Sequence, residues 1–152
     1  MWRPDVHFQF DALIREVAGR YGLDWLLVKA QVAAESAFRP DAFRKEPGPP
    51  EQGSYGLMQV LWTTARGDLG YTGSPEGLFD PAVNLELGVK YLSRLIKVFK
   101  DYRLALAAYN CGPGRVQQLQ RKHGPAWRQV EPHLPNVTRA YVARIEQYRQ
   151  DF

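Results

Sequence analysis

Apolar residues recur near the start of the chain at spacings of three and four, which is the pattern of an amphipathic α-helix. The first apolar stripe consists of Phe10, Leu13, Ile14, Val17 and Tyr21. This stripe predicts a helix that ends near Gly22. Asp24 then offers an N-cap for a second helix, which we expect over residues 25–36 because this stretch is almost wholly apolar.

The second half of the chain predicts further helices. Asp80-Pro81 is a strong start signal, because Asp can cap a helix and Pro suits its first position. The apolar face expected for the long helix that follows comprises Val83, Leu87, Tyr91, Leu95 and Val98, and its solvated face Lys90, Arg94, Lys97 and Lys100. Residues 104–109 predict a buried helix ending at Asn110, before a turn at residues 112–114. Residues 115–122 and 136–150 predict two more helices.

The segment between the two sets of helices is a predicted loop over residues 38–54. Its helix-breaking residues are Pro40, Pro47, Gly48, Pro49, Pro50 and Gly53. This density excludes a long helix or a central strand, and no Asn-Gly or Asp-Gly hairpin signature accompanies it. We therefore expect an all-α fold in one domain over residues 1–152. Since long loops are usually functional, we expect this one to form a wall of a cleft.

Composition narrows the class of protein. The 152 residues suffice for one compact domain, and the single cysteine, Cys111, has no partner for an internal disulfide. His7, His123 and His133 are scattered, so we expect no metal and no cofactor. Apolar runs are too short for a membrane span of about 20 residues. The N-terminus lacks the apolar core of a secretory signal, which predicts another export route or a trimmed sequence.

The formal net charge of +4 favours a polyanionic partner, and both nucleic acid and the bacterial cell wall qualify. The basic residues are dispersed along the chain, with no run of five or more. This distribution excludes a nucleic-acid-binding tail, and a solvated helical surface is the simplest interpretation of it.

Glu35 is the main candidate for chemistry. At about 100° per residue it falls between Gln31 and Val32 on the predicted helix, well away from Lys29, so it shares a largely apolar face. Partial burial disfavours an ionised carboxylate and raises its pKa, and a carboxylic acid that stays protonated near neutral pH can act as a general acid. The alternative is a helix-end glutamate that points into water beside Ser36.

Four segments in series carry a family resemblance. They are residues 34–42 (Ala-Glu-Ser-Ala-Phe-Arg-Pro-Asp-Ala), 55–60 (Tyr-Gly-Leu-Met-Gln-Val, followed by Thr64-Ala65), 107–116 (Ala-Ala-Tyr-Asn-Cys-Gly-Pro-Gly-Arg-Val) and 138–142 (Thr-Arg-Ala-Tyr-Val). Together they resemble the catalytic domain of the soluble lytic transglycosylases, a branch of the lysozyme-like superfamily that includes goose-type lysozymes. The resemblance spans nearly the whole chain.

The resemblance implies an all-α lysozyme-like domain of roughly seven helices around a glycan-binding groove. It implies that Glu35 is the catalytic acid and base. The residues it implies for substrate binding are Ser36, Met58, Gln59, Tyr109, Asn110 and Tyr141. The expected partner is peptidoglycan glycan strands in the bacterial cell wall, bound by a monomer that needs no metal or cofactor, binds no nucleic acid and inserts into no membrane.

Two positions depart from the family pattern. Val137 stands where the family usually has Glu before Thr-Arg, so a second carboxylate at the groove edge is missing. Cys111 stands where the family usually has Ala. A buried cysteine behaves as a small hydrophobe and no neighbouring histidine supplies a base, so we interpret Cys111 as a packing residue and not a nucleophile.

The resemblance also implies a reaction that needs one carboxylate. Glu35 would cleave the β-1,4 bond between N-acetylmuramic acid and N-acetylglucosamine, assisted by the substrate's N-acetyl group, to leave a 1,6-anhydro end. Most glycosidases use two carboxylates, and Asp41 and Glu46 lie only on the proline-rich loop.

Three alternatives to the transglycosylase stay open: a muramidase on the same fold that admits water, a non-catalytic wall-binding module of a phage particle, and a basic helical nucleic-acid binder. The last lacks a recognition motif. The missing signal is compatible with a phage lysis or virion enzyme, or with a domain excised from a longer exported protein.

Overall fold

The computed structural model describes residues 2–152 and is mostly helical. Its α-helices are α1 (Pro4–His7), α2 (Asp11–Arg20), α3 (Trp25–Ser36), α4 (Trp62–Arg66), α5 (Pro81–Phe99), α6 (Tyr102–Cys111), α7 (Pro113–His123), α8 (Trp127–Val130) and α9 (Asn136–Asp151). Two 3₁₀ turns, η1 (Glu76–Phe79) and η2 (Glu131–His133), and three short strands complete the fold. The predicted all-α class is confirmed, with a small sheet added.

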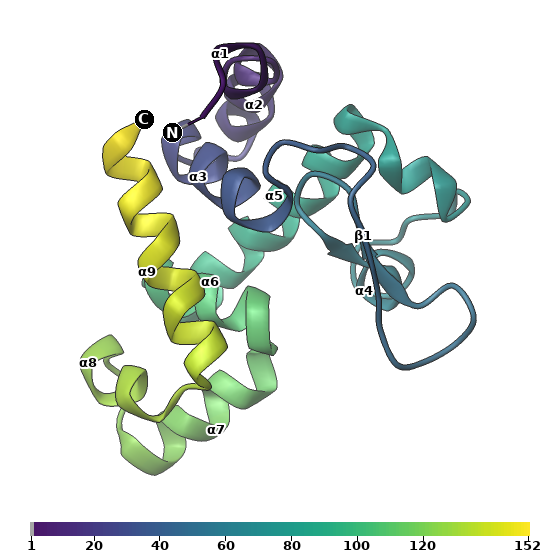
Figure 1. Ribbon diagram of the computed structural model, residues 1–152. Helices are drawn as coiled ribbons and strands as arrows, with labels where there is room; N and C mark the ends of the chain where they lie inside the picture. Colours follow the sequence, from purple (N-terminus) through teal and green to yellow (C-terminus); the bar gives the residue numbers. More distant parts are fainter. Residues whose placement is uncertain (1) are drawn as a thin grey trace.

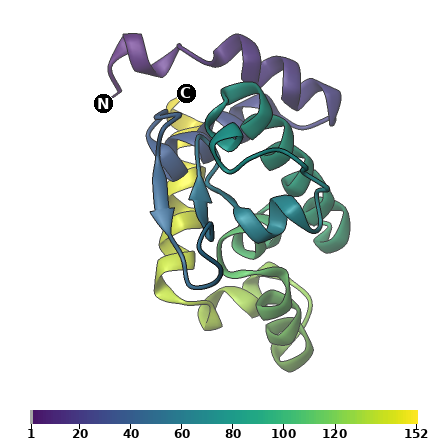
Figure 2. The same cartoon turned by 90° about the vertical axis from the view of Figure 1, so that its right-hand side faces the viewer.

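Most of the helices lie on one side of α5, and the sheet lies on the other side together with α4. Figure 1 shows α3, α6 and α9 packed side by side, with the strands and α4 on the other side and α5 running between the two parts. Viewed from a perpendicular direction, the strands stand apart from α7 and α8 (Figure 2). The ends of the described chain meet, since the rings of Trp2 and Phe152 have centroids 6.5 Å apart.

Helix α3 forms as its sequence predicts. The side chain of Asp24 accepts a hydrogen bond from the backbone N–H of Leu26 at 3.0 Å, which caps the helix. At the other end, Ala37 and Phe38 adopt left-handed backbone conformations with φ of 52° and 62°. This double turn sends the Phe38 side chain back into the core, where it is only 2% exposed, and leaves Glu35 in the last turn of α3.

The prediction of a loop without a central strand over residues 38–54 was wrong. Strands β1 (Phe43–Lys45), β2 (Gly53–Tyr55) and β3 (Val60–Leu61) form an antiparallel sheet in the order β1-β2-β3, with β2 in the centre. Pro47, Pro49 and Pro50 lie in the connection between β1 and β2, and Pro40 precedes β1, so all of them are outside the strands. Gly53 is needed in β2 because a Cβ there would lie 2.5 Å from the ring of Phe43. Strands of three residues carry too short a pattern to be seen in the sequence.

Asn84 of α5 fastens the sheet to the helices. Its side-chain amide donates to the backbone oxygens of Tyr55 (2.7 Å) and Leu78 (2.8 Å) and accepts from the N–H of Met58 (2.8 Å). Asn84 is fully buried. Gly56 makes this approach possible, because a Cβ there would lie 2.5 Å from the Asn84 amide nitrogen. One side chain thus satisfies three buried backbone groups, two where β2 turns toward β3 and one in η1.

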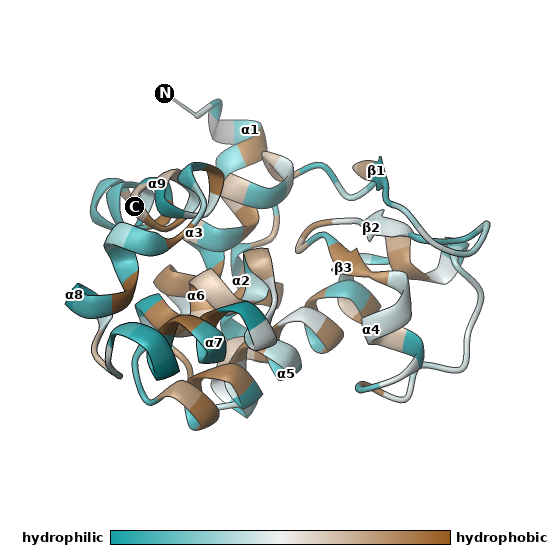
Figure 3. Ribbon diagram, turned by 90° about the horizontal axis from the view of Figure 1, so that it is seen from below, coloured by the Kyte–Doolittle hydropathy of each residue, from teal (hydrophilic) through white to brown (hydrophobic). Residues whose placement is uncertain are grey.

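The apolar face of α5 is rotated from the predicted one at its C-terminal end. Phe99 is buried, whereas Val98, which we expected on the apolar face, is 58% exposed. The two residues are about 100° apart around the helix, so only one of them can face the core. Hydropathy colouring shows apolar and hydrophilic segments alternating along the helices (Figure 3).

The positive charge of Lys29 is paired away from Glu35, although both residues lie on α3. Lys29 is 1% exposed, and its Nζ lies 2.7 Å from Asp11 Oδ1. The rings of Phe8 and Phe152 lie 5.0 Å from the same nitrogen. The cation of α3 is therefore neutralised where α2 and the chain ends meet, and no charge on α3 itself offsets the burial of Glu35.

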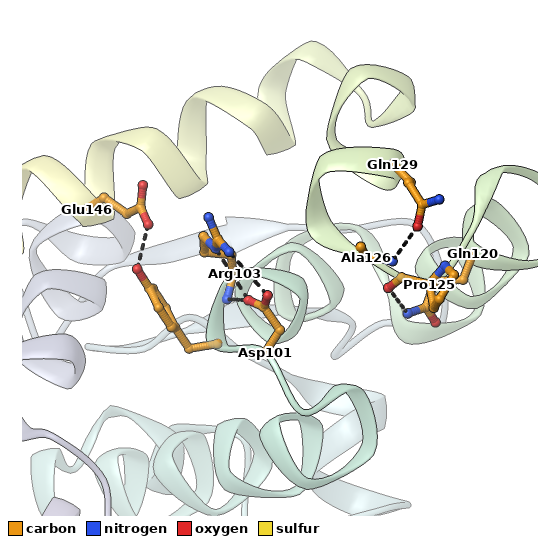
Figure 4. A network of polar contacts seen from close by, with 8 residues as sticks. Asp101, Arg103, Gln120, Pro125, Ala126, Gln129 and Glu146 are labelled. Atoms are coloured by element: carbon orange, nitrogen blue, oxygen red, sulfur yellow. Dashed lines mark hydrogen bonds and ion pairs between the residues drawn. The ribbon is translucent and has the colours of Figure 1, made fainter.

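Polar contacts join the ends of the later helices. Figure 4 shows the carboxylate of Glu146 on α9, which accepts from the hydroxyl of Tyr102 on α6 at 2.7 Å. Asp101 caps α6 by accepting from the N–H of Arg103 at 2.8 Å. The side chain of Gln120 on α7 donates to the carbonyl of Pro125 at 3.0 Å. The contact between Tyr102 and Glu146 links α6 to α9, and α9 packs against α3.

Two sequence expectations concerned membranes and metals. Among residues 2–152, no helix has both the length and the apolar character needed to cross a bilayer. The same residues contain no group of three or more His, Cys, Asp or Glu side chains arranged to hold a metal ion.

We expect Asn84→Ala to lower the free energy of unfolding by at least about 3 kcal/mol, because it leaves three buried backbone groups without partners at about 1–3 kcal/mol each. Urea denaturation measures this loss. Asn136→Ala is the control, since Asn136 is exposed at the start of α9. Equal stability of the two variants would mean that Asn84 does not fasten the turn.

Candidate active site

Glu35 lies where α3 meets α9. Its Oε2 accepts a hydrogen bond of 2.9 Å from the hydroxyl of Tyr141. That hydroxyl in turn accepts one of 3.0 Å from the side-chain amide of Gln31, one turn earlier on α3. Gln31 and Tyr141 are both buried. The carboxyl group is therefore held in one orientation by a chain of two hydrogen bonds from its own helix and the neighbouring one.

Burial raises the pKa of Glu35 to about 8. Two weaker effects oppose it: the hydrogen bond from Tyr141 and the positive charge of Arg44 both favour the carboxylate. Glu35 is half-buried, so its carboxyl group sits among protein atoms and still borders the open space. At neutral pH this group is mainly the protonated acid, and the alternative of a solvated helix-end glutamate is not what the structure contains.

Glu35 opens into a small cavity that we call the acid pocket. Its volume is about 210 Å³, and it is lined by Glu35, Arg44, Glu46, Ser54, Gln59, Leu61, Tyr109 and Asn110. A second cavity of about 430 Å³, the wide pocket, is lined by Gln59, Val60, Leu61, Thr64, Asp68, Tyr91, Tyr109, Asn110, Cys111, Gly112 and Pro113. Four of these residues line both pockets, so the two pockets adjoin, and we refer to them together as the groove.

The turn at residues 56–59 shapes the groove by its backbone. The hydroxyl of Tyr109 donates to the carbonyl of Met58 at 2.7 Å. Gln59 has a φ of 49°, and its side-chain amide donates to the carbonyls of Ala42 (3.2 Å) and Gly56 (3.0 Å). Met58 itself is fully buried, and its side chain packs against Gly88. Of the two turn residues predicted to bind substrate, Gln59 lines the groove and the Met58 side chain does not.

The remaining residues predicted to bind substrate also divide into those that line the groove and those that are buried beneath it. Asn110 is exposed and lines both pockets, and its side-chain oxygen accepts from the hydroxyl of Thr138 at 2.8 Å. Ser36 is buried, and its hydroxyl donates to the carbonyl of Val32 at 3.1 Å. Tyr141 is buried behind Glu35. The groove thus collects Glu35, Gln59, Tyr109 and Asn110, while Ser36, Met58 and Tyr141 support them from inside.

The side of the acid pocket opposite the helices is formed by residues that sequence reasoning did not select. Arg44 and Ser54 are paired across β1 and β2, and both line the pocket, as does Glu46 just after β1. The sequence analysis placed Glu46 only on the proline-rich loop. The available signal was the sequence Phe-Arg-Lys-Glu before the prolines, but its strand character became visible only in the structure.

Cys111 lines the wide pocket and is half-buried. Burial raises the pKa of its thiol, which opposes thiolate formation. Tyr109 and Tyr141 are protonated donors, because burial and the charge of Glu35 hold the pKa of both phenols well above the usual value. The arrangement can therefore supply one proton from Glu35 to a group in the acid pocket, which neutral donors and acceptors and the charged pair Arg44 and Glu46 also line.

Comparisons with known proteins show the family to which the chain is similar. The family described as "Transglycosylase SLT domain" matches residues 12–129. Membrane-bound lytic murein transglycosylase C of Histophilus somni (strain 2336) is 38% identical over 121 residues, covering 70% of this chain and 32% of that protein. Membrane-bound lytic murein transglycosylase F of Desulfosudis oleivorans is 34% identical over 149 residues, covering 89% of this chain and 30% of that protein. The chain thus spans about a third of the length of these relatives.

A solved structure extends the likeness to the fold. An inactive Glu-to-Gln mutant of the lytic transglycosylase Slt from Pseudomonas aeruginosa superimposes with a TM-score of 0.78 at 34% identity. The match covers 95% of this chain and 24% of that one. Since the family match includes α3, the turn at residues 56–59 and α6, it covers every residue that lines the acid pocket. The chain belongs to the SLT transglycosylase family.

Proposed function

We propose that this chain is the catalytic domain, over residues 1–152, of a peptidoglycan lytic transglycosylase that acts in the bacterial cell wall. The observation that carries the proposal is the half-buried carboxyl group of Glu35, with its pKa raised to about 8, at the edge of a polar pocket in an SLT-family fold. The relatives are named as murein transglycosylases, and the matched Slt structure is an inactive Glu-to-Gln mutant, so one glutamate is essential in that enzyme.

The first step of the proposed reaction uses Glu35 as an acid. The protonated carboxyl gives its proton to the glycosidic oxygen as the bond from C1 of N-acetylmuramic acid to that oxygen breaks, and N-acetylglucosamine leaves as an alcohol. The carbonyl oxygen of the substrate's N-acetyl group bonds to C1 and takes up the developing positive charge. Glu35 is now a carboxylate, and the hydrogen bond from Tyr141 stabilises it.

The second step uses the same carboxylate as a base. Glu35 removes the proton from the C6 hydroxyl, whose oxygen bonds to C1 while the bond from C1 to the acetyl oxygen breaks. The product is a 1,6-anhydro ring, Glu35 is protonated again and no water is consumed. Neutral groups of the groove, including Gln59 and Asn110, would hold sugar hydroxyls and N-acetyl groups and so keep the C6 hydroxyl in place.

A muramidase is the second candidate, because Glu46 lines the same pocket as Glu35. A second carboxylate can activate a water molecule as the acceptor. The two reactions share the first step and differ in the product end. Product analysis therefore separates them.

The test is digestion of purified bacterial sacculi followed by mass spectrometry of the released muropeptides. We expect 1,6-anhydro-N-acetylmuramic acid ends, which borohydride does not reduce. Glu35→Gln should keep the fold and lose at least about 100-fold in rate, because an amide cannot exchange the proton. Glu16→Gln, which changes a largely exposed carboxylate on α2, is the matched control.

Three results would contradict the proposal. Product ends that are all reducible and one water heavier identify a muramidase. Near-normal rates in a folded Glu35→Gln variant exclude Glu35 as the acid. If the wild-type protein binds sacculi and releases nothing under any condition, the chain is a wall-binding module.

Tyr141 is proposed as a positioning residue that acts through Glu35. Tyr141→Phe keeps the ring and removes the donor to the carboxylate, so the rate should fall about ten-fold or more, the order of a hydrogen bond to a charged group. Because that hydrogen bond lowers the pKa of Glu35, its removal should also move the alkaline decline in rate to higher pH.

Tyr148→Phe is the control for this experiment, as Tyr148 lies on the same helix, beyond hydrogen-bonding reach of Glu35. A purely structural role for Tyr141 would lower the melting temperature and leave the alkaline limb of the pH profile where it is.

A further inference from the structure

A charged pair on the β1–β2 hairpin faces the catalytic carboxyl group. Strand alternation turns Arg44 and its cross-strand partner Ser54 toward the acid pocket, while the ring of Phe43 packs against Tyr55 on the other face. The guanidinium Nε of Arg44 lies 3.3 Å from Oε1 of Glu46, which lines the same pocket. The pair therefore belongs to the groove, although it lies on an element separate from the helices that hold Glu35.

The side chains of Arg44 and Glu46 differ in how much of their surface is exposed. The side chain of Arg44 is 76% exposed and that of Glu46 is 27% exposed. The backbone N–H of Glu46 donates to the carbonyl of Gln52 at 3.3 Å, and three prolines in residues 47–50 restrict the connection that follows. Glu46 is thus the more buried partner, and Arg44 is a largely exposed cation that is paired with it.

Few charged or titratable groups face Glu35. Tyr141 approaches from α9 and Tyr109 from α6, and both are neutral phenols. From the hairpin come Arg44 and Glu46, and Arg44 is the one cation among the described residues that line the acid pocket. The charge of Arg44 lowers the pKa of Glu35, against the larger effect of burial.

We propose that Arg44 and Glu46 are positioning residues that set the acid–base balance of Glu35, with Glu46 holding the arginine at the pocket mouth and limiting its approach to the carboxyl group. The inference rests on the proposed function, in which Glu35 must be protonated in the first step and ionised between the steps. A cation held nearby stabilises the intermediate carboxylate, whereas a cation in direct contact would ionise Glu35 too early.

The experiment is an NMR titration of the ¹³C-labelled carboxyl groups of the free protein at low ionic strength, with Glu35→Gln to assign the Glu35 signal. Arg44→Gln should raise the midpoint of Glu35 by about half a pH unit, the order expected for one largely solvated charge nearby. Glu46→Gln should lower the midpoint, because it releases Arg44 toward Glu35. The double variant should match Arg44→Gln, since Glu46 acts through the arginine.

Lys45→Gln is the matched control. Lys45 is the next residue of β1, is exposed and donates to the carbonyl of Pro50 at 2.7 Å. Its replacement by Gln removes one positive charge, as Arg44→Gln does, but from the other face of the strand. We expect Lys45→Gln to shift the titration midpoint of Glu35 clearly less than Arg44→Gln does. An equal shift in Lys45→Gln, or shifts of the same sign in Arg44→Gln and Glu46→Gln, would overturn the inference.

Turnover of sacculi by the same variants separates this inference from the proposed function. The titration needs no substrate, so it succeeds or fails whatever the products are. Activity of Glu46→Gln should persist, with its alkaline decline moved to lower pH. Loss of activity at every pH, with the titration of Glu35 unchanged, would make Glu46 a reacting carboxylate and refute its positioning role.

Discussion

The packing of α9 against the last turns of α3 is the interaction on which the site depends. It surrounds the Glu35 carboxyl with protein atoms, which raises its pKa, and it brings the Tyr141 hydroxyl to 2.9 Å from the same group. Burial and the hydrogen bond oppose each other, since the first favours the acid and the second the carboxylate. The role proposed for Glu35, giving up and regaining one proton, needs both effects, and this helix pair supplies them together.

The opposite wall of the groove is formed by the backbone of a turn that neighbouring side chains hold in place. Asn84 and Gly56 lock the turn between β2 and β3 against α5, and Tyr109 bonds to the carbonyl of Met58 in that turn. The fixed turn gives Gln59 its position in both pockets. This explains how a fully buried Met58 belongs to a motif associated with substrate: it anchors the wall that substrate would touch.

The sequence predicted the parts of the molecule that local patterns encode. The cap at Asp24, the start at Asp80-Pro81 and the apolar surroundings of Glu35 follow from helical periodicity and match the structure. The three short strands do not follow from local patterns. Their pairing joins residues across a proline-rich connection and depends on contacts between residues that are distant in sequence. Arg44 and Glu46 were missed for the same reason, and the buried roles of Ser36 and Met58 needed the packed neighbours that only the fold supplies.

The central claim is that burial keeps Glu35 protonated at neutral pH, and the stability of the protein tests it without any substrate. The pKa of Glu35 rises from 4.5 to about 8 on folding, so stability from this group is complete below 4.5 and is lost as the pH rises toward 8. Denaturant unfolding of the wild type and Glu35→Gln across this window should show the wild type losing about 1 kcal/mol per pH unit relative to the variant. Parallel stability curves would mean that Glu35 ionises like an ordinary surface glutamate, and the account of the acid would fail.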